Sequence, residues 1–341
     1  MVRCVRVPRS GGETARQVLS ERDLLSETHD IEATEDAVYI PLSGSGDAET
    51  VRSLLESSLD GNDRSTIQIE DRDLPRRETQ TLPADSLGFE PTYERLGRIA
   101  IIDEDDPERA REVATAIAES DLPVDTVVNR ASKVKGEMRI RDWDVLVGET
   151  TETVHREYGN SFELDIAAVY FSPRLATDRR RVVESVDADE QVFDMFAGVG
   201  PFVIPAAKRA AAVVGVDINP TAIEYLRRNA ERNGVTDRVT AICGDVSAVS
   251  GYDDWADRIV MNLPHSAEEF LDTAVELAAE EAVIHYYDIA GDDEPFAPGE
   301  AAIRGAANAG GYDVEIETRR VVRSYAPHEL NVRLDARLRR R

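Results

Sequence analysis

Cysteine, lysine and long apolar runs are all scarce in this chain of 341 residues. The two cysteines, Cys4 and Cys243, are too few for a disulfide framework or for a metal site built from cysteine alone. No apolar run approaches the roughly 20 residues of a membrane-spanning helix, and the first residues lack the apolar centre of a signal peptide. We therefore expect a soluble cytoplasmic protein with no membrane contact and no metal site.

Acidic residues greatly outnumber basic ones: 67 oppose 40, which leaves a net charge of −27. Only three of the basic residues are lysines, namely Lys133, Lys135 and Lys208. Acids spread along the whole chain, with lysine almost absent, are characteristic of proteins from halophilic archaea. An acidic surface alone argues against a nucleic-acid partner. In molar salt, however, the Debye length falls to about 3 Å, so arginines can still hold RNA at short range.

Composition and pattern predict three α/β domains. Residues 1–60 form a small N-terminal domain, and the polar, Asp- and Arg-rich residues 61–97 are expected to be a linker. Residues 98–186 form a middle domain that is basic relative to the rest, and residues 187–341 form the C-terminal domain. Before residue 187 we expect strands at 4–7, 37–42, 99–102, 126–128, 144–147 and 162–166, and helices at 12–19 and 107–120.

Strands and helices alternate regularly in the C-terminal domain. The expected strands are 191–194, 212–217, 238–242, 257–261 and 282–288, and the expected helices are 202–211, 221–233, 266–280 and 300–309. Two late strands, 313–323 and 329–337, have no helix between them and suggest an antiparallel hairpin at one edge. This alternation predicts a Rossmann-like, doubly wound and mostly parallel sheet that binds ligands at the carboxyl ends of its strands.

The segment Asp194-Met-Phe-Ala-Gly-Val-Gly-Pro-Phe202 joins the first of these strands to its helix. Gly198 and Gly200 let the backbone pass close to a ligand where a side chain would clash. They also leave free N–H groups near the start of a helix. A second acid, Asp217, ends the next strand, where it could reach a ribose. The pair predicts a nucleotide-like cofactor.

The residues after the glycines distinguish between cofactors. A nicotinamide enzyme would carry G-x-G-x-x-G, but Pro201, Phe202 and Val203 follow Gly200, so the third glycine is absent. An acid four residues before the first glycine is instead typical of Rossmann-like methyltransferases that use S-adenosylmethionine. Asp217 would then bind the ribose hydroxyls. The remaining contacts predicted for the cofactor are Phe196 and Ile218, Asp245 beside the adenine edge, and Asn262.

Asn262-Leu-Pro264 lies at the end of the fourth strand of this domain. Methyltransferases that act on planar nitrogens commonly carry Asn/Asp-x-Pro there. The amide and a backbone carbonyl can accept the N–H of the target, and the proline fixes the loop beside the sulfonium. At this place in the sheet the triplet favours a catalytic role for Asn262 and Pro264 over an ordinary turn.

Several segments together resemble one family, the archaeal and eukaryotic tRNA (guanine-N1)-methyltransferases that act at tRNA position 37. The matching segments are Val169-Tyr-Phe-Ser-Pro-Arg174, Asp194–Phe202, Asp217-Ile-Asn-Pro220, Asn262-Leu-Pro-His-Ser-Ala-Glu-Glu-Phe270, His285-Tyr-Tyr287 and Ser324-Tyr-Ala-Pro-His-Glu329. The resemblance covers residues 130–335 closely and extends more loosely to the N-terminal domain. It implies a tRNA substrate, a monomer that spans the tRNA, and an N-terminal domain that recognises the outer corner of the tRNA.

The resemblance also implies roles for individual residues. Arg139, in Glu137-Met-Arg-Ile-Arg141, stands where the family has an arginine that hydrogen-bonds guanine O6. Tyr170 and Arg174 would contact the substrate. The family's general base is a glutamate just beyond the Ser-Pro-Arg motif, and the corresponding residue here is Asp178. Aspartate is one methylene shorter, so this position departs from the family pattern.

Three other functions remain open from the sequence. An aminocarboxypropyl transferase of wyosine synthesis uses the same cofactor at the same tRNA position. An rRNA or protein N-methyltransferase would share the sheet but would leave the N-terminal domain unexplained. A non-catalytic RNA-binding protein could keep the sheet, but it would bind no cofactor. The intact set of Asp194, Gly198, Gly200, Asp217 and Asp245 instead predicts cofactor binding.

Overall fold

The computed structural model describes residues 1–44, 47–59, 66–77, 80–132, 136 and 139–341. Lys133, Lys135 and Glu137, which the sequence analysis named, lie outside these residues. The chain divides into an N-terminal unit, Met1–Thr81, and a C-terminal unit, Leu82–Arg341. In the described part of the chain, no helix is long and apolar enough to cross a membrane.

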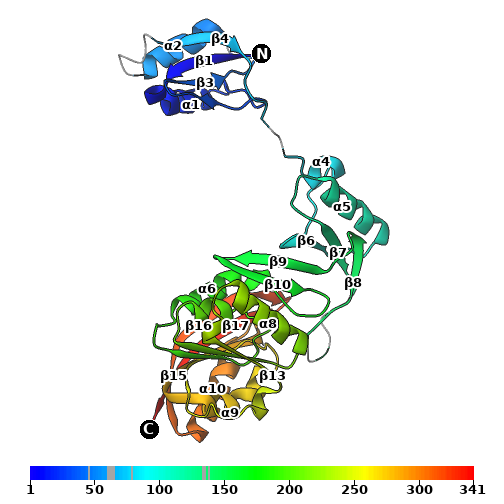
Figure 1. Cartoon of the computed structure of the whole chain (residues 1–341), viewed down its shortest axis with the longest axis vertical. Coiled ribbons are helices and arrows are strands. Elements are labelled where there is room, and N and C mark those ends of the chain that lie inside the picture. Colours follow the sequence, from blue (N-terminus) through cyan, green and yellow to red (C-terminus); the bar gives the residue numbers. More distant parts are fainter. Residues whose placement is uncertain (45–46, 60–65, 78–79, 133–135, 137–138) are drawn as a thin grey trace. The chain divides into compact units, whose positions relative to one another are not determined.

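In its described residues, the N-terminal unit has a four-stranded sheet in the order β2-β3-β1-β4 and two α-helices (Figure 1). Its strands are β1 (Val2–Pro8), β2 (Glu32–Ala33), β3 (Ala37–Pro41) and β4 (Gln68–Arg72), and its helices are α1 (Gly12–Ser20) and α2 (Ala48–Ser58). The side chain of Asp47 starts α2 by accepting the backbone N–H groups of Glu49 and Thr50. Alternating residues of β1, Val5 and Val7, are fully buried beneath the helices.

Part of the range 61–97, for which a linker is predicted, is helix or strand instead. β4 pairs antiparallel with β1 over Gln68–Arg72 and so belongs to the first sheet. The same range also holds α4 (Pro83–Leu87) and β5 (Glu94–Leu96). The prediction failed because β4 is an edge strand, and its charged, half-exposed residues have the composition of a loop. The range therefore cannot act as one flexible coil.

The C-terminal unit begins with a second four-stranded sheet in the order β5-β6-β7-β8. Besides β5 it contains β6 (Ile99–Ile102), β7 (Thr126–Arg130) and β8 (Trp143–Val147), with α5 (Pro107–Glu119) on one face. Pro107 occupies the first turn of α5 and Asp106 caps it. A separate hairpin, β9 (Glu152–Glu157) and β10 (Asn160–Asp165), follows this sheet. Residues of β5, β6 and β7 share one apolar core with β10, so the two parts of this unit are packed together.

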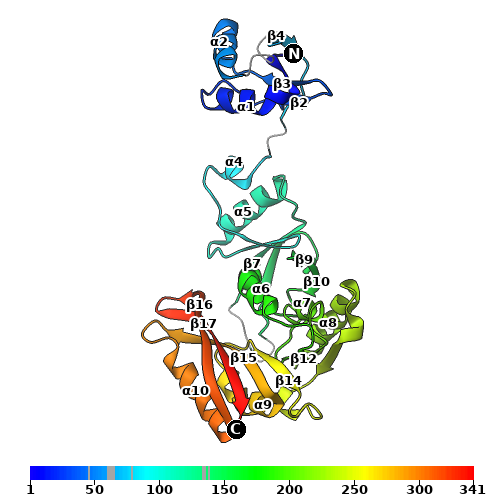
Figure 2. The ribbon, with the colours of Figure 1, turned by 90° about the vertical axis from the view of Figure 1, so that its left-hand side faces the viewer.

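A seven-stranded sheet in the order β13-β12-β11-β14-β15-β17-β16 completes the C-terminal unit (Figure 2). Its first five strands are parallel, and β17 and β16 add an antiparallel hairpin at one edge. The strands are β11 (Gln191–Asp194), β12 (Ala212–Asp217), β13 (Val239–Cys243), β14 (Ala256–Met261), β15 (Ala278–Gly291), β16 (Tyr312–Ala326) and β17 (Glu329–Arg340). The predicted doubly wound, mostly parallel sheet is confirmed.

Helices cover both faces of this sheet. The helices are α6 (Ala176–Glu184), α7 (Val203–Ala207), α8 (Pro220–Arg232), α9 (Leu271–Leu277) and α10 (Ala297–Ala309). Figure 1 shows α6 and α8 on one side and α9 and α10 on the other. Val192 packs with α7 and α8, and the next residue, Phe193, packs with α9 and α10. This alternation along a buried strand is what places core on both faces.

Candidate active site

Four polar side chains lie at the carboxyl ends of four neighbouring parallel strands. Asp194 ends β11, Asp217 ends β12, Asp245 follows β13 and Asn262 follows β14. The strand order β13-β12-β11-β14 brings these ends together, and the chain reverses its winding direction between β11 and β14. Such a switch point is where open α/β sheets bind their ligands.

Asp194 is a buried acid with half of its carboxylate unused. Its side chain is 1% exposed, and Oδ1 accepts the backbone N–H of Phe196 at 3.2 Å. Oδ2 has no hydrogen-bond partner among the described residues. Burial raises the pKa of Asp194 to about 7, and the nearby charge of Asp217 adds to this effect. A ligand with a cationic donor would supply the missing partner and stabilise the ionised form.

Asp217 holds the glycine turn in place. Its Oδ2 accepts the N–H of Gly198 at 2.7 Å, and its Oδ1 accepts the N–H of Asn219 at 2.9 Å. Burial raises the pKa of this carboxyl too. Each oxygen keeps a second lone pair, so Asp217 can still accept a diol. Asn219 caps α8 and also donates to the carbonyl of Ala168 at 2.8 Å, and so ties the turn to the segment that carries Tyr170.

The other residues predicted for the cofactor lie around the same edge. Ile218 follows Asp217 and is 43% exposed, so it offers an apolar surface to a flat ring at this edge. Phe196 contacts the ring of Phe270, with the centroids 5.1 Å apart. Asp245 is exposed, and its Oδ1 accepts the N–H of Ser247 at 2.9 Å.

These groups fit S-adenosylmethionine. The orphaned Oδ2 of Asp194 suits the ammonium of its methionyl part, Asp217 suits the ribose hydroxyls, and the exposed face of Ile218 suits the adenine. When bound, this cofactor supplies an electrophilic methyl group on a sulfonium.

The two glycines make separable contributions, which alanine substitutions can test. A Cβ at Gly200, where φ is +91°, would collide with the Leu226 side chain and lie 3.1 Å from Ile204. A Cβ at Gly198 would meet only the carbonyl of Tyr170 at 3.9 Å and would otherwise enter the space assigned to the cofactor.

We expect Gly200→Ala to lower the free energy of unfolding by about 3 kcal/mol, from overpacking and backbone strain. Gly198→Ala, at φ of +52°, should lose only about 1–2 kcal/mol to backbone strain. It should bind S-adenosylmethionine at least about tenfold more weakly, since a new methyl occupies the site. Thermal unfolding and equilibrium dialysis measure the two quantities. Equal loss of cofactor affinity and stability in both variants would contradict this division of roles.

A cavity of about 110 Å³ is lined in part by Tyr170, whose carbonyl lies beside Gly198 of the glycine turn. It brings together three of the residues predicted to act on the substrate, Arg139, Tyr170 and Arg174. It is strongly basic for so acidic a protein, because the arginines on its wall outnumber the single carboxylate, Glu94. These arginines are Arg130, Arg139, Arg141, Arg174 and Arg323. A locally basic cavity fits a phosphate-bearing substrate.

Arg139 connects this cavity to the Asn-x-Pro loop. Its Nη1 donates to the carbonyl of Pro264 at 3.4 Å, and its guanidinium carbon lies 5.0 Å from the ring centroid of Tyr170. Its backbone has φ of +54°, an uncommon conformation for a residue with a Cβ. Backbone strain of this kind clusters at functional sites. The predicted base-binding arginine therefore does lie beside Pro264 and Tyr170.

Asn262 presents a second orphaned acceptor. Its Oδ1 is buried and has no partner in the described part of the chain. The loop that follows is braced from two sides, by Arg139 at Pro264 and by Tyr325, whose ring lies 5.4 Å from that of His265. A rigid, unpaired amide oxygen at this edge can accept an N–H from a planar base.

Asp178 lies in a different setting from the other predicted catalytic residues. It is 4% exposed, and Oδ1 accepts Nη1 of Arg333 at 2.7 Å and lies 3.3 Å from Nε of Arg320. Its Oδ2 accepts the hydroxyl of Tyr287 at 2.7 Å. Burial raises the pKa of Tyr287 well above its usual value, so this hydroxyl stays protonated. In the described residues, no hydrogen bond joins Asp178 to the wall of the basic cavity.

The partners of Asp178 belong to a buried polar chain on the α6 face of the sheet. Arg333 also pairs with Asp335, which accepts Nδ1 of His285 at 2.6 Å. Although burial alone would raise it, these two neighbours hold the pKa of Asp335 at about 2. Nε2 of His285 contacts Arg258 at 2.8 Å, and Arg258 pairs with Glu190 at 2.7 Å. The network anchors α6 to the central strands.

Sequence reasoning missed some members of the site. Arg141 and Arg323 line the basic cavity, and burial lowers the pKa of Arg141, with a further contribution from Arg130. Nε of Arg323 is buried without a partner among the described residues. Arg141 could have been found in the basic stretch around Arg139. Arg323 had no local signal, because only the final hairpin brings it to this cavity.

Three family profiles match the chain. A profile described as "TRM5/TYW2 methyltransferase domain" matches residues 153–315. One described as "tRNA methyltransferase 5 N-terminal domain" matches residues 4–50, and one described as "TYW2 N-terminal domain" matches residues 79–151. Together they cover most of both structural units.

The chain is similar in sequence to enzymes of two kinds that modify tRNA position 37. The chain is 40% identical to the tRNA (guanine(37)-N(1))-methyltransferase Trm5b of Pyrococcus abyssi, with 99% of both chains covered. It is 30% identical to the tRNA(Phe) (4-demethylwyosine(37)-C(7)) aminocarboxypropyltransferase of Methanocaldococcus jannaschii, but that match covers 73% of this chain and 98% of the relative. The methyltransferase relative is thus matched over the N-terminal unit as well.

Two solved structures are similar over much of the fold. A complex of aTrm5 and tRNALeu has a TM-score of 0.73 and 31% identity, covering 98% of this chain and 99% of that one. M. jannaschii TYW2 in complex with AdoMet has a TM-score of 0.60 and 28% identity, covering 73% of this chain and 100% of that one.

Proposed function

This chain belongs to the TRM5/TYW2 methyltransferase family, and from that premise we propose that it transfers the methyl group of S-adenosylmethionine to N1 of guanosine 37 in tRNA. The observation that carries the proposal is the position of Arg139. It contacts Pro264 of the Asn-x-Pro loop and Tyr170, whose carbonyl lies beside the cofactor glycine Gly198. A base in the cavity would therefore meet a cation, an amide oxygen and the methyl donor together.

The chemistry assigns a task to each group. Guanine N1 carries a proton at neutral pH, so a base must accept it as the new bond forms, which contributes about 10²–10⁴-fold. Negative charge then develops on O6, where the guanidinium of Arg139 stabilises it. The free Oδ1 of Asn262 can accept an N–H of the base and hold its edge in place. In-line placement of N1 against the methyl group is an effect of orientation.

We propose Asp178 as the proton acceptor, with Tyr170 and Arg174 as contacts of the substrate. Asp178 is the acid at the position of the family's glutamate, and its carboxylate lies between two arginines. The same contacts support a second role, in which Asp178 anchors α6 through Arg333 and Tyr287 and leaves the proton to water. The two roles predict different effects for substitutions at Asp178 and Tyr287.

The proposal also covers the role of each domain, the oligomeric state and the location in the cell. We infer a cytoplasmic monomer in which the N-terminal unit, predicted as residues 1–60 and extending to Thr81, recognises the outer corner of the tRNA. Residues 98–186 complete the active site, and residues 187–341 bind the cofactor. The match of residues 4–50 to a tRNA methyltransferase N-terminal domain supports the first assignment.

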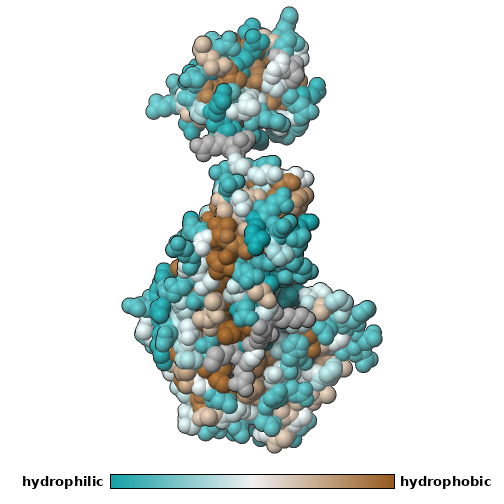
Figure 3. Space-filling model, turned by 90° about the vertical axis from the view of Figure 1, so that its right-hand side faces the viewer, coloured by the Kyte–Doolittle hydropathy of each residue, from teal (hydrophilic) through white to brown (hydrophobic). Residues whose placement is uncertain are grey.

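We further propose that the protein is adapted to high salt. Hydrophilic residues dominate the surface that is in view in Figure 3, and the net charge of −27 makes the folded chain repel itself. Raising the salt from about 0.1 M to about 1 M shortens the Debye length from about 10 Å to about 3 Å. The thermal midpoint should therefore rise with potassium chloride over this range. A midpoint that is flat or falls would contradict the adaptation.

The rival within the family is transfer of the aminocarboxypropyl group. It requires attack on a different carbon of the same cofactor, so the product separates the two reactions. We expect mass spectrometry of tRNA digests to show guanosine heavier by one methylene. The much larger gain of an aminocarboxypropyl group, on a wyosine precursor and not on guanosine, would assign the chain to the other branch of its family.

A further inference from the structure

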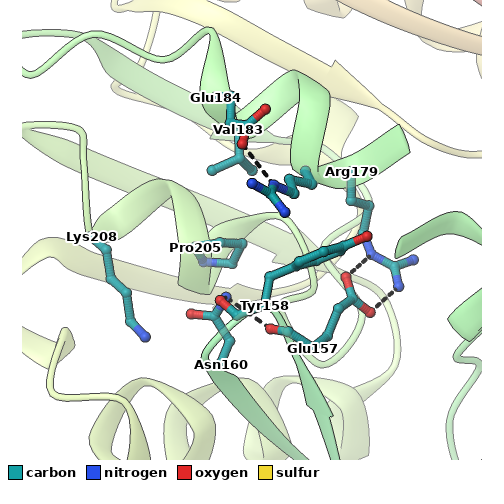
Figure 4. A pocket seen from close by; sticks show the side chains of 9 residues that line it. Glu157, Tyr158, Asn160, Arg179, Val183, Glu184, Pro205 and Lys208 are labelled. Carbon is teal, nitrogen blue, oxygen red and sulfur yellow. Dashed lines mark hydrogen bonds and ion pairs between the residues drawn. The ribbon is translucent and has the colours of Figure 1, made fainter. Parts of the chain in front are cut away.

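A cavity of about 400 Å³ lies beside the β9–β10 turn, outside the site described above (Figure 4). Tyr158 and Asn160 of the turn, Arg179 and Arg180 of α6, and Lys208 beyond the end of α7 line it. None of the roles proposed so far uses this space.

Tyr158 occupies a strained position in the turn. Glu157 pairs with Asn160 across the hairpin, so the loop consists of Tyr158 and Gly159, with φ of +46° and +77°. Two-residue turns with both φ values positive favour Asn-Gly, and a bulky side chain at the first position is strained. The ring is nevertheless 51% exposed, and the guanidinium of Arg180 lies 4.7 Å from its centroid. An aromatic ring held open at such a position suits a stacking surface.

Asn160 presents an unused acceptor at the same cavity. Its side chain is 6% exposed, and Nδ2 donates to the carbonyls of Glu157 at 3.2 Å and Tyr158 at 3.3 Å. Those two carbonyls require a donor, so the orientation of the amide is fixed. Oδ1 is then buried with no partner in the described part of the chain. Figure 4 shows this side chain between Tyr158 and Lys208. A hydroxyl or N–H of a ligand could donate the missing hydrogen bond to Oδ1 of Asn160.

The cations of the cavity differ in how far they are neutralised. Arg179 is paired with Glu157 at 2.6 Å, and Arg180 with Glu184 at 2.7 Å. Lys208 donates to the carbonyl of Gly159 at 3.2 Å, and among the described residues no carboxylate pairs with it. An ammonium has three donors, so Lys208 keeps donors for an anion.

Arg179 connects this cavity to the basic cavity of the active site. Its Nη1 donates to the carbonyl of Ser172 at 3.0 Å, and its guanidinium lies 5.2 Å from the ring of Phe171. Both Ser172 and Phe171 line the basic cavity. The two cavities are therefore separated by a few side chains, and one strand of RNA could enter both.

We propose that this cavity binds one ribonucleoside phosphate unit of the tRNA, close in the strand to the nucleotide that is methylated. Its base stacks on Tyr158, its phosphate is held by Lys208, and a ribose hydroxyl donates to Oδ1 of Asn160. This inference rests on the proposed function, since it takes the tRNA as the source of the nucleotide. A free nucleotide offers the same groups, and the experiment separates the two sources.

The test measures tRNA affinity by filter binding with the full-length protein, together with cofactor affinity and thermal unfolding. Tyr158→Asn removes the ring and its contacts with Arg180 and Thr177 but relieves the strain of the positive φ, so the variant should be about as stable as the wild type. We expect it to bind tRNA about tenfold more weakly, the scale of one lost base–aromatic stack. Lys208→Gln should reduce the salt dependence of binding by just under one counterion. Arg304→Gln, an exposed cation on α10 on the other face of the sheet, is the matched control.

Two results would overturn the proposal. If both variants bind tRNA as tightly as the Arg304→Gln control, the cavity is not a tRNA subsite. If adenosine monophosphate binds to the wild type and not to the Tyr158→Asn variant, while tRNA affinity is unchanged, the occupant is a free nucleotide. Because binding is measured without turnover, a wild-type protein that binds tRNA but fails to methylate it would refute the proposed function and leave this test intact.

Discussion

Replacing Arg139 by alanine is expected to lower kcat for tRNA methylation by about 10²–10³-fold, the cost of removing one donor from a developing oxyanion. The guanidinium lies against the Pro264 carbonyl and the Tyr170 ring, outside the strand ends assigned to the cofactor. The affinity for S-adenosylmethionine should therefore stay at the wild-type value. Single-turnover methylation and equilibrium dialysis measure the two effects.

Arg139→Ala removes the guanidinium without changing the backbone strain at this position. Arginine and alanine both carry a Cβ, so the strain of φ at +54° is common to both, and the change tests the side chain alone. Arg139→Lys should recover little activity, because an ammonium lacks the planar fork and the stacking of a guanidinium. Arg111→Ala, an exposed arginine on α5, serves as the control. Loss of cofactor affinity in the Arg139 variant would mean that the residue shapes the glycine turn instead.

The second large effect is expected for Asp178→Asn. If Asp178 accepts the proton of N1, kcat should fall by about 10²–10⁴-fold while cofactor affinity is unchanged. The substitution also leaves the buried Arg333 with one fewer anion. We therefore expect a loss of roughly 3 kcal/mol in the free energy of unfolding. Rate measurements must be made well below the thermal midpoint of the variant.

Tyr287→Phe distinguishes the two roles of Asp178. It removes the hydroxyl that donates to Oδ2 and leaves the charges in place. A proton acceptor freed of this donor should keep or increase its activity. An anchoring residue should lose activity in parallel with stability, since α6 is loosened in both variants. A fall in kcat for Tyr287→Phe as large as that for Asp178→Asn would transfer the base role to another group.

The residues predicted for the cofactor site could be chosen from the sequence because their signals are local. Each of Asp194, Asp217 and Asp245 follows an apolar strand, and parallel strands bring their carboxyl ends to one edge whatever their side chains do next. The contacts of Arg139 have a different origin. They depend on a turn with positive φ and on a loop 125 positions further along the chain. Only the resemblance to a family indicated that residue.

The surroundings of Asp178 could not be predicted from any window of the sequence. Its partners Tyr287, Arg320 and Arg333 lie on three strands at the antiparallel edge of the sheet, more than 100 residues away. Alternation along those strands decides which side chains face α6. The linker prediction for residues 61–97 missed β4 for a related reason. Pairing with β1, and not local composition, makes β4 a strand.

The central claim is that the target is N1 of the guanosine at position 37. The most direct measurement is primer extension on a tRNA transcript treated with the enzyme and S-adenosylmethionine in molar salt, since a methyl group at N1 blocks base pairing. We predict a stop at position 37 for the guanosine transcript and none when that position is adenosine. Full activity on the adenosine transcript, or a stop elsewhere, would contradict the assignment.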